Sequence, residues 1–147
     1  VAKVQRMRDA NPILLVEDDV VDVKTVERAF RELGIVAPLV IRSSGEEALD
    51  WLHTRGGSEA GGRLPAVILL DLNMPRMDGL EFLRIIKADA ALKRIPVIVL
   101  TTSQEECDRS ASFELGAAGY VRKPVDFARF VDAMRVVNHY WTLSELP

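Results

Sequence analysis

The sequence lacks the features that mark disulfide-rich secreted domains and membrane-spanning proteins. It contains one cysteine, Cys107, so no internal disulfide can form, and this favours a reducing compartment. No apolar run approaches the ~18 residues that a membrane-spanning helix needs. The first twelve residues are polar and contain no apolar signal core. We therefore expect a cytoplasmic protein without a membrane partner.

A strong charge of one sign is also absent. The 19 Lys and Arg residues nearly balance the 22 Asp and Glu residues, the formal net charge is −3, and the basic residues are scattered along the chain. A general nucleic-acid binder would show a basic patch or stripe instead, so we expect no nucleic-acid partner. What the chain has is an ordinary apolar fraction, 48% over 147 residues. That length predicts one domain that buries roughly two thirds of the surface of its unfolded chain.

Short apolar runs alternate with segments of helical spacing. The expected strands are Ile13–Val16, Pro38–Ile41, Ala66–Leu70, Pro96–Leu100 and Gly119–Val121. Strict alternation of strands and helices predicts an α/β fold in which helices cover both faces of a parallel sheet. The glycine-rich stretch from 54 to 64 is too short to separate two domains, and we expect it to form a long loop before the third strand.

The expected helices have recognisable stripes and ends. The first helix ends at Gly34 and has an apolar stripe of Val23, Val26, Phe30 and Leu33, and a second runs from its cap Ser44 through Gly45 to about Arg55. A third helix is marked by Leu80, Leu83 and Ile86, and a fourth runs from its cap Ser103 to Leu115 and stops at Gly116. A fifth is capped by Asp126 and has one apolar face of Phe127, Val131, Met134 and Val137. Asp19 is interpreted as the N-cap of the first helix, where a negative charge is favourable.

Carboxylates follow two of the expected strands. Asp71 closes the run Ala66–Leu70, and Glu17 and Asp18 follow Ile13–Val16. In open α/β sheets, ligands bind at the carboxyl ends of the strands. Three carboxylates at close range repel one another, and a divalent cation removes that repulsion. All-oxygen ligands suit Mg²⁺, so the cluster predicts a Mg²⁺ site that holds a phosphoryl group, with Asp71 as a nucleophile that forms an aspartyl-phosphate.

Two further strand ends supply groups for the same phosphoryl oxygens. Thr101 and Thr102 follow the fourth expected strand, and a hydroxyl there can donate a hydrogen bond to a phosphoryl oxygen. Lys123 follows the fifth strand and can bring a positive charge to the same oxygens. Phosphoryl transfer depends mostly on positioning and charge neutralisation, and these residues can provide both.

In this order and at these strand ends, Glu17-Asp18, Asp71, Thr101 and Lys123-Pro124 resemble the receiver domain of two-component response regulators. The segment Asp71-Leu72-Asn73-Met74-Pro75-Arg76-Met77-Asp78-Gly79 is similar to that family's phosphoacceptor loop almost in full. The resemblance covers about residues 13–140 and leaves an N-terminal extension, 1–12, and a C-terminal tail, 141–147. It implies a flavodoxin-like, doubly wound (βα)5 fold with a five-stranded parallel sheet in the order 2-1-3-4-5.

The resemblance also implies a role for each matching residue. Asp71 would accept a phosphoryl group from a phosphohistidine of a sensor histidine kinase. Asp18 would bind Mg²⁺ directly, Glu17 directly or through water, and the backbone carbonyl of Asn73 would complete the protein ligands. Thr101 would supply a switch hydroxyl that follows the phosphoryl group, and Lys123 would be the phosphate partner. Tyr120 would be an aromatic switch, and Thr102 would control access to the aspartate.

Other features are similar to those of the small regulators that pair with bacterial phytochromes. They are the glycine-containing insertion before the third strand, the sequence Leu100-Thr101-Thr102-Ser103, and the aromatic pair Tyr140-Trp141 before the tail. This resemblance implies a bacteriophytochrome as the kinase. A homodimer through the fourth helix, fifth strand and fifth helix is also expected, because the last helix and the tail carry several apolar residues: Phe130, Val136, Tyr140 and Trp141.

Only a short tail follows the fifth helix, so output is expected from the receiver surface itself, through altered protein contacts or as a phosphorelay intermediate. Two other accounts stay open. A phosphatase of the haloacid dehalogenase type also forms an aspartyl-phosphate, but it needs a second aspartate two residues after the nucleophile, where this chain has Asn73. A constitutive scaffold would keep the fold without being phosphorylated.

Overall fold

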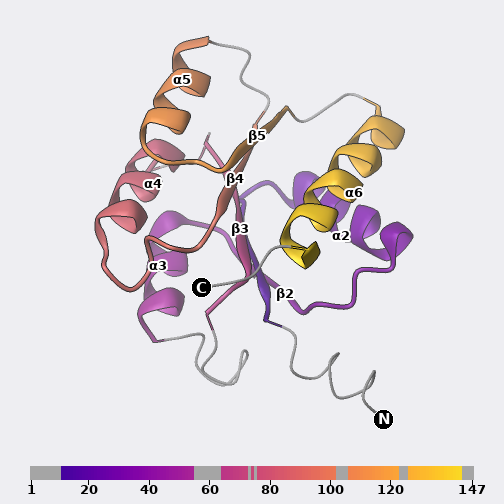
Figure 1. Cartoon of the computed structure of the whole chain (residues 1–147), viewed down its shortest axis with the longest axis horizontal. Helices are drawn as coiled ribbons and strands as arrows, with labels where there is room; N and C mark the ends of the chain where they lie inside the picture. The colour runs from indigo at the N-terminus through magenta and orange to yellow at the C-terminus, as the bar shows by residue number, and fades with distance from the viewer. Residues whose placement is uncertain are drawn as a thin grey trace.

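The computed structural model describes residues 11–54, 64–72, 74, 76–101, 106–122 and 126–143, without the side chains of 101, 106–109, 122 and 140–143. Strands and helices alternate through this part of the chain (Figure 1). In chain order the elements are β1 (Ile13–Val16), α2 (Val20–Leu33), β2 (Leu39–Arg42), α3 (Gly45–His53), β3 (Val67–Asp71), α4 (Gly79–Ala88), β4 (Val97–Thr101), α5 (Glu106–Glu114), β5 (Gly119–Arg122) and α6 (Phe127–Leu143).

The strands form one parallel sheet in the order β2-β1-β3-β4-β5, which confirms the predicted order. In the register, Val16 of β1 lies opposite Arg42 of β2 and Leu70 of β3, and Asp71 lies opposite Leu100 of β4. Helices α2 and α6 cover one face of the sheet, and α3, α4 and α5 cover the other (Figure 1). The fold is therefore the expected three-layer α/β arrangement.

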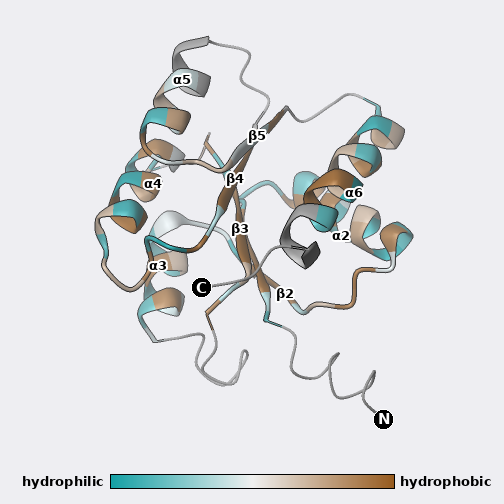
Figure 2. Cartoon of the chain, in the orientation of Figure 1, coloured by the Kyte–Doolittle hydropathy of each residue, from teal (hydrophilic) through white to brown (hydrophobic). Residues whose placement is uncertain are grey.

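The core lies on both faces of the sheet, because successive side chains of a strand point to opposite faces. Leu14, Ile68 and Val99 belong to the cluster under α3, α4 and α5. Leu15, Leu69 and Leu100 belong to the cluster under α2 and α6. All six are at most 1% exposed, and the strands are apolar along their length in Figure 2. Burial on both faces explains why these strands read as continuous apolar runs and not as alternating ones.

The helix ends follow the predicted caps where the structure describes them. The Asp19 carboxylate accepts hydrogen bonds from the backbone N–H of Val21 (2.8 Å) and Asp22 (3.1 Å), which confirms it as the N-cap of α2. Gly34 ends α2 with a φ of 66°, a left-handed conformation that costs glycine little. Ser44 caps α3, which ends at His53, two residues before the predicted end. Ser103 lies outside the described residues.

One expectation about the last helix is wrong. The sequence analysis includes Phe130 among the apolar residues of a homodimer face, but it is 3% exposed and packs with Val131 and Met134 in the core under α2 and α6. Helix α6 lies against α2, where the guanidinium of Arg28 is 4.0 Å from the ring centre of Phe127. Val136 is 70% exposed, as a surface role requires. The side chains of 140 and 141 are outside the described part of the chain.

Candidate functional site

Three carboxylates meet at the carboxyl edge of the sheet. Glu17 directly follows β1, and Asp71 is the last residue of β3. Because Val16 and Leu70 lie opposite each other in the register, the residues after them emerge side by side. Asp18 is next along the chain, and the three side chains bring one carboxylate oxygen each to within 4.8 Å of the others. The sequence prediction that Glu17, Asp18 and Asp71 converge is confirmed.

The three carboxylates differ in burial. Glu17 is 2% exposed and Asp71 is 5% exposed, whereas Asp18 is exposed. The backbone fixes Glu17, because its N–H donates to the carbonyl of Arg42 (3.0 Å) and its Oε1 accepts from the N–H of Asp19 (3.1 Å). Charges this close and this buried repel one another strongly, since little solvent screens them.

A hard divalent cation fits this cluster. The donors are all carboxylate oxygens, they lie close enough to share one ion, and two of them are buried while the third opens to solvent. Mg²⁺ typically takes one or two carboxylates and keeps several waters, so the exposed side leaves space for waters or a phosphate oxygen. The cluster can therefore hold a divalent metal ion.

The loop after Asp71 folds back tightly onto it. The N–H of Gly79 donates to the carbonyl of Leu72 (3.0 Å), and a Cβ on Gly79 would lie 2.5 Å from the Leu72 Cα and 2.7 Å from the Asp71 carbonyl oxygen. Asp78 caps α4 by accepting from the N–H of Glu81 (2.8 Å). Within the loop, Arg76 has a φ of 65°, which is strained for a residue with a side chain.

The sequence analysis missed the role of Gly79. The sequence shows only a glycine after Asp78, and that pattern does not reveal which backbone the glycine touches.

The other predicted site residues are described in part. The backbone of Thr101 closes β4, one residue beyond the Asp71–Leu100 pair, so it reaches the same edge. Tyr120 lies on β5 opposite Val99 and is half-buried. Its ring lies 6.5 Å from that of Phe113, a contact that the sequence did not suggest. The remaining predicted positions, Asn73, Thr102 and Lys123, are outside the described residues.

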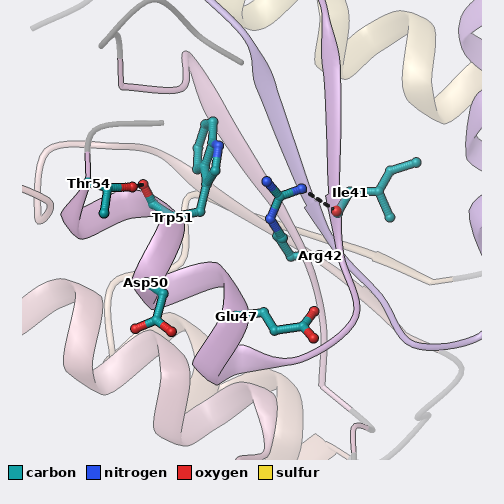
Figure 3. A pocket seen from close by; sticks show the side chains of 6 residues that line it. All are labelled: Ile41, Arg42, Glu47, Asp50, Trp51 and Thr54. Carbon is teal, nitrogen blue, oxygen red and sulfur yellow. Dashed lines mark hydrogen bonds between the residues drawn. The ribbon is translucent and has the colours of Figure 1, made fainter. Parts of the chain in front are cut away.

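A shallow groove of about 580 Å³ lies beside α3 and the edge strand β2 (Figure 3). Its lining residues are Ile41, Arg42, Glu47, Asp50, Trp51 and Thr54. The carbonyls of Pro38 and Arg42 accept hydrogen bonds from the β1 side. Carbonyls alternate in direction along a strand, so the Ile41 carbonyl faces the open edge of the sheet. It accepts a hydrogen bond there from the Arg42 guanidinium (2.7 Å). Arg42 thereby covers an edge carbonyl that could pair with another chain.

None of the helices in the described part of the chain has the length and apolar character needed to span a bilayer.

Comparison with known proteins gives consistent matches. The response regulator receiver domain family matches residues 13–135. Response regulator Rcp1 of Synechocystis sp. is 39% identical over 136 residues, which cover 90% of this chain and 92% of Rcp1. The crystal structure of the phosphorylated cyanobacterial phytochrome response regulator RcpA has a TM-score of 0.83 at 34% identity and covers 94% of this chain and 99% of RcpA. The Mn²⁺-bound form of Rcp1 has a TM-score of 0.80 at 37% identity, with 93% and 99% covered.

Proposed function

We propose that this chain, which belongs to the response regulator receiver domain family, accepts a phosphoryl group on Asp71 and signals by changing its contacts with other proteins. The observation that carries the proposal is the position of Asp71. Its carboxylate ends a buried strand, at the sheet edge, within 4.8 Å of carboxylate oxygens from Glu17 and Asp18. A purely structural role for Asp71 would not explain why two further carboxylates lie beside it.

In the proposed reaction, a carboxylate oxygen of Asp71 attacks the phosphorus of a phosphohistidine. The P–O bond forms as the P–N bond breaks, and the departing imidazole takes up a proton. We assign Mg²⁺ to Glu17, Asp18, Asp71 and the backbone carbonyl of Asn73, where the ion would neutralise charge on the transferring phosphoryl oxygens. A Mn²⁺-bound form of the relative Rcp1 supports a divalent cation at this place.

Four further residues receive proposed roles from the family pattern. The Lys123 ammonium pairs with the phosphoryl oxygens, the Thr101 hydroxyl follows the phosphoryl group, and Thr102 limits access of water to Asp71. Tyr120 responds to Thr101 as the aromatic switch. The coupling of Tyr120 to Thr101 is supported by two positions: the Thr101 backbone lies at the carboxyl edge, and the half-buried Tyr120 lies on the neighbouring strand.

The proposed phosphodonor is a sensor histidine kinase of the phytochrome type, acting in the cytoplasm. The relative RcpA is a phytochrome response regulator, which supports this kinase class. Output comes from the surface of α5, β5 and α6, through homodimerisation or another protein contact, and exposed Phe113 and Val136 on α5 and α6 support such a surface. Passing the phosphoryl group onward as a phosphorelay intermediate is the second candidate output.

Phosphotransfer from an autophosphorylated, radiolabelled kinase tests the central claim. We expect Mg²⁺-dependent label on the parent chain and none on the Asp71→Asn variant. Asp132→Asn is the matched control, because it removes a carboxylate from the exposed surface of α6 and should keep full labelling. Label retained by Asp71→Asn would refute the assignment. Sustained turnover of small phosphate esters by the parent chain would instead favour a phosphatase, and absence of any Mg²⁺-dependent label would favour a scaffold.

A further inference from the structure

Phe113 is an exposed aromatic residue whose ring meets that of Tyr120. It lies in the last turn of α5 and is 48% exposed, yet its ring centre is 6.5 Å from that of Tyr120 and the two ring planes meet at 41°. Tilted pairs with centres 4.5–7 Å apart are favourable beyond the area they bury. The ring contact links this exposed residue to Tyr120, the proposed aromatic switch.

Backbone hydrogen bonds fix the turn between the two elements that carry these rings. The N–H of Gly116 donates to the carbonyl of Phe113 (3.0 Å), and Gly116 turns the chain with a φ of 99°. The N–H of Ala118 then donates to the carbonyl of Val97 (2.8 Å), which ties the start of β5 to β4. The rings are thus carried on two fixed elements joined by a short, hydrogen-bonded turn.

The position of Phe113 relative to the acidic site follows from the topology. In a parallel sheet, each connecting helix runs opposite to the strands, so the C-terminal turn of α5 lies toward the amino edge of the sheet. Asp71 and the backbone of Thr101 are at the carboxyl edge. Tyr120 lies opposite Val99, and Val99 is two residues before Thr101. The side chain of Tyr120 packs against the core cluster under α3, α4 and α5. Phe113 therefore contacts Tyr120 from the side away from Asp71.

We propose that Phe113 is a positioning residue that holds Tyr120 in the arrangement of the unmodified protein and so opposes the phosphorylated state. The proposal rests on the proposed function, in which phosphorylation of Asp71 draws Tyr120 toward Thr101. A ring moving in that direction leaves Phe113 and loses the aromatic contact. Such a contact changes the equilibrium between the two positions by about two- to tenfold. By linkage, the same factor appears in the affinity for any ligand that stabilises the phosphorylated state.

Fluorine NMR of the full chain labelled with 3-fluorotyrosine tests this proposal. The chain has two tyrosines, so a Tyr140→Phe background leaves Tyr120 as the sole reporter. Beryllium trifluoride with Mg²⁺ serves as the phosphoryl mimic. In the parent, we expect the mimic to move the Tyr120 resonance. In Phe113→Leu, which keeps an apolar side chain but removes the ring, the resonance without mimic should lie partway to the mimic-bound position, and half-saturation should need two- to tenfold less mimic.

Phe113→Trp is the control, because it restores a ring at a half-exposed position and should return both readouts toward the parent. A residue that only stabilises the fold would change the melting temperature and leave the resonance position and the half-saturation unchanged, and that result would overturn the proposal. Weaker binding of the mimic by Phe113→Leu would overturn it as well.

The outcome separates from that of the proposed function. If Asp71 takes up label from the kinase but Tyr120 does not respond to the mimic, the role of Phe113 is overturned and phosphoacceptance stands. If Asp71 takes up no label and the mimic does not bind, both fail.

Discussion

At the scale of single residues, the acidic site depends on a residue that carries no chemistry. Gly79 lets the loop after β3 return onto the backbone of Asp71 and Leu72, with no space for even one carbon atom. The two nearest atoms belong to the backbone, so they cannot move aside as the end of a flexible side chain would. A side chain at this position must displace the peptide that carries the proposed nucleophile.

We therefore predict that Gly79→Ala lowers both stability and phosphotransfer. The clash should reduce the free energy of unfolding by about 1–3 kcal/mol, as overpacking does elsewhere. Because Asp71 shifts relative to Glu17 and Asp18, labelling by the kinase should slow by about tenfold or more. Urea unfolding and single-turnover phosphotransfer measure the two effects.

Gly34 supplies a matched control. It has a φ of 66° at the end of α2 but no atom within 4 Å of where a Cβ would stand, so Gly34→Ala has only backbone strain. It should cost about 1 kcal/mol of stability and leave phosphotransfer unchanged. Equal loss of phosphotransfer in both variants would show that the effect of Gly79→Ala is general destabilisation.

The sequence allowed prediction of the acidic residues but not of the residues that position them. Glu17, Asp18 and Asp71 each follow an apolar run, and the parallel order of the strands is enough to bring them together. The tight approach of Gly79 to Leu72 and the ring contact of Phe113 with Tyr120 depend on distances between separate segments. No spacing in the chain encodes those distances, so they required the structure.

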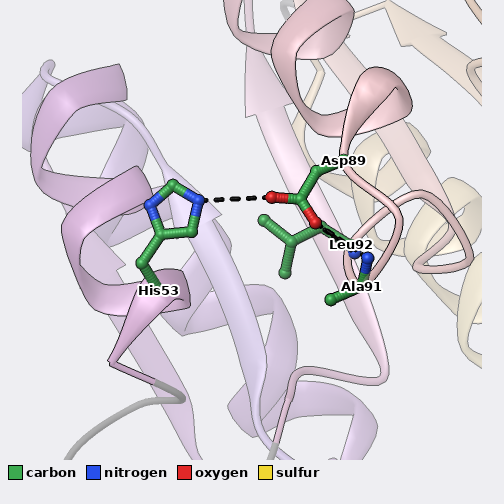
Figure 4. Close-up of polar contacts among 4 residues, drawn as sticks. All are labelled: His53, Asp89, Ala91 and Leu92. Carbon is green, nitrogen blue, oxygen red and sulfur yellow. Dashed lines mark hydrogen bonds and ion pairs between the residues drawn. The ribbon is translucent and has the colours of Figure 1, made fainter.

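At the scale of elements, the strands and most helix ends were predictable, because apolar runs, caps and glycines mark them locally. The width of the buried face of a helix could not be predicted in the same way. Helix α6 shows a stripe through Phe127, Val131 and Met134, but it packs against both α2 and the sheet and so buries Phe130 too. Polar side chains also meet between elements, since Nε2 of His53 on α3 lies 3.3 Å from Oδ2 of Asp89, which follows α4 (Figure 4).

The surroundings of Asp89 predict how acid affects the stability of the fold. The pKa of Asp89 is lowered from its ordinary 3.8, first by the backbone N–H of Ala91 (2.8 Å) and then by His53 (3.3 Å) and Leu92. A lowered pKa means that the folded state prefers the ionised carboxylate. Its stabilisation is therefore present above pH 3.8 and is lost as the pH falls through the lower folded value.

The expected result is that stability falls less steeply between pH 5 and pH 2 in Asp89→Asn than in the parent, by urea unfolding at each pH. His53→Gln should keep most of the parent's slope, because the hydrogen bond from Ala91 is the larger cause. If His53→Gln loses the slope as fully as Asp89→Asn, the bridge between the helices is the dominant cause instead.

At the scale of the whole molecule, the fold has a local cost at its functional edge. The sheet is apolar on both faces and stabilised by two core clusters, while its carboxyl edge gathers three like charges within 4.8 Å. Two of these carboxylates are buried, so solvent screens their repulsion poorly. Metal binding and global stability should therefore be coupled, because a cation held by this cluster would bind the folded protein and not the unfolded chain.

Removing one carboxylate should reduce the stabilisation by Mg²⁺. Without divalent cations, Asp18→Asn should be more stable than the parent by about 1 kcal/mol, because its repulsion with Glu17 and Asp71 is gone and Asp18 is partly screened by solvent. At a hundredfold excess over the dissociation constant, Mg²⁺ should stabilise the parent by about 2.7 kcal/mol and this variant much less. Thermal unfolding with EDTA or Mg²⁺ measures both terms, with Asp132→Asn expected to match the parent. A parent whose melting temperature ignores Mg²⁺ would contradict a metal site in this cluster.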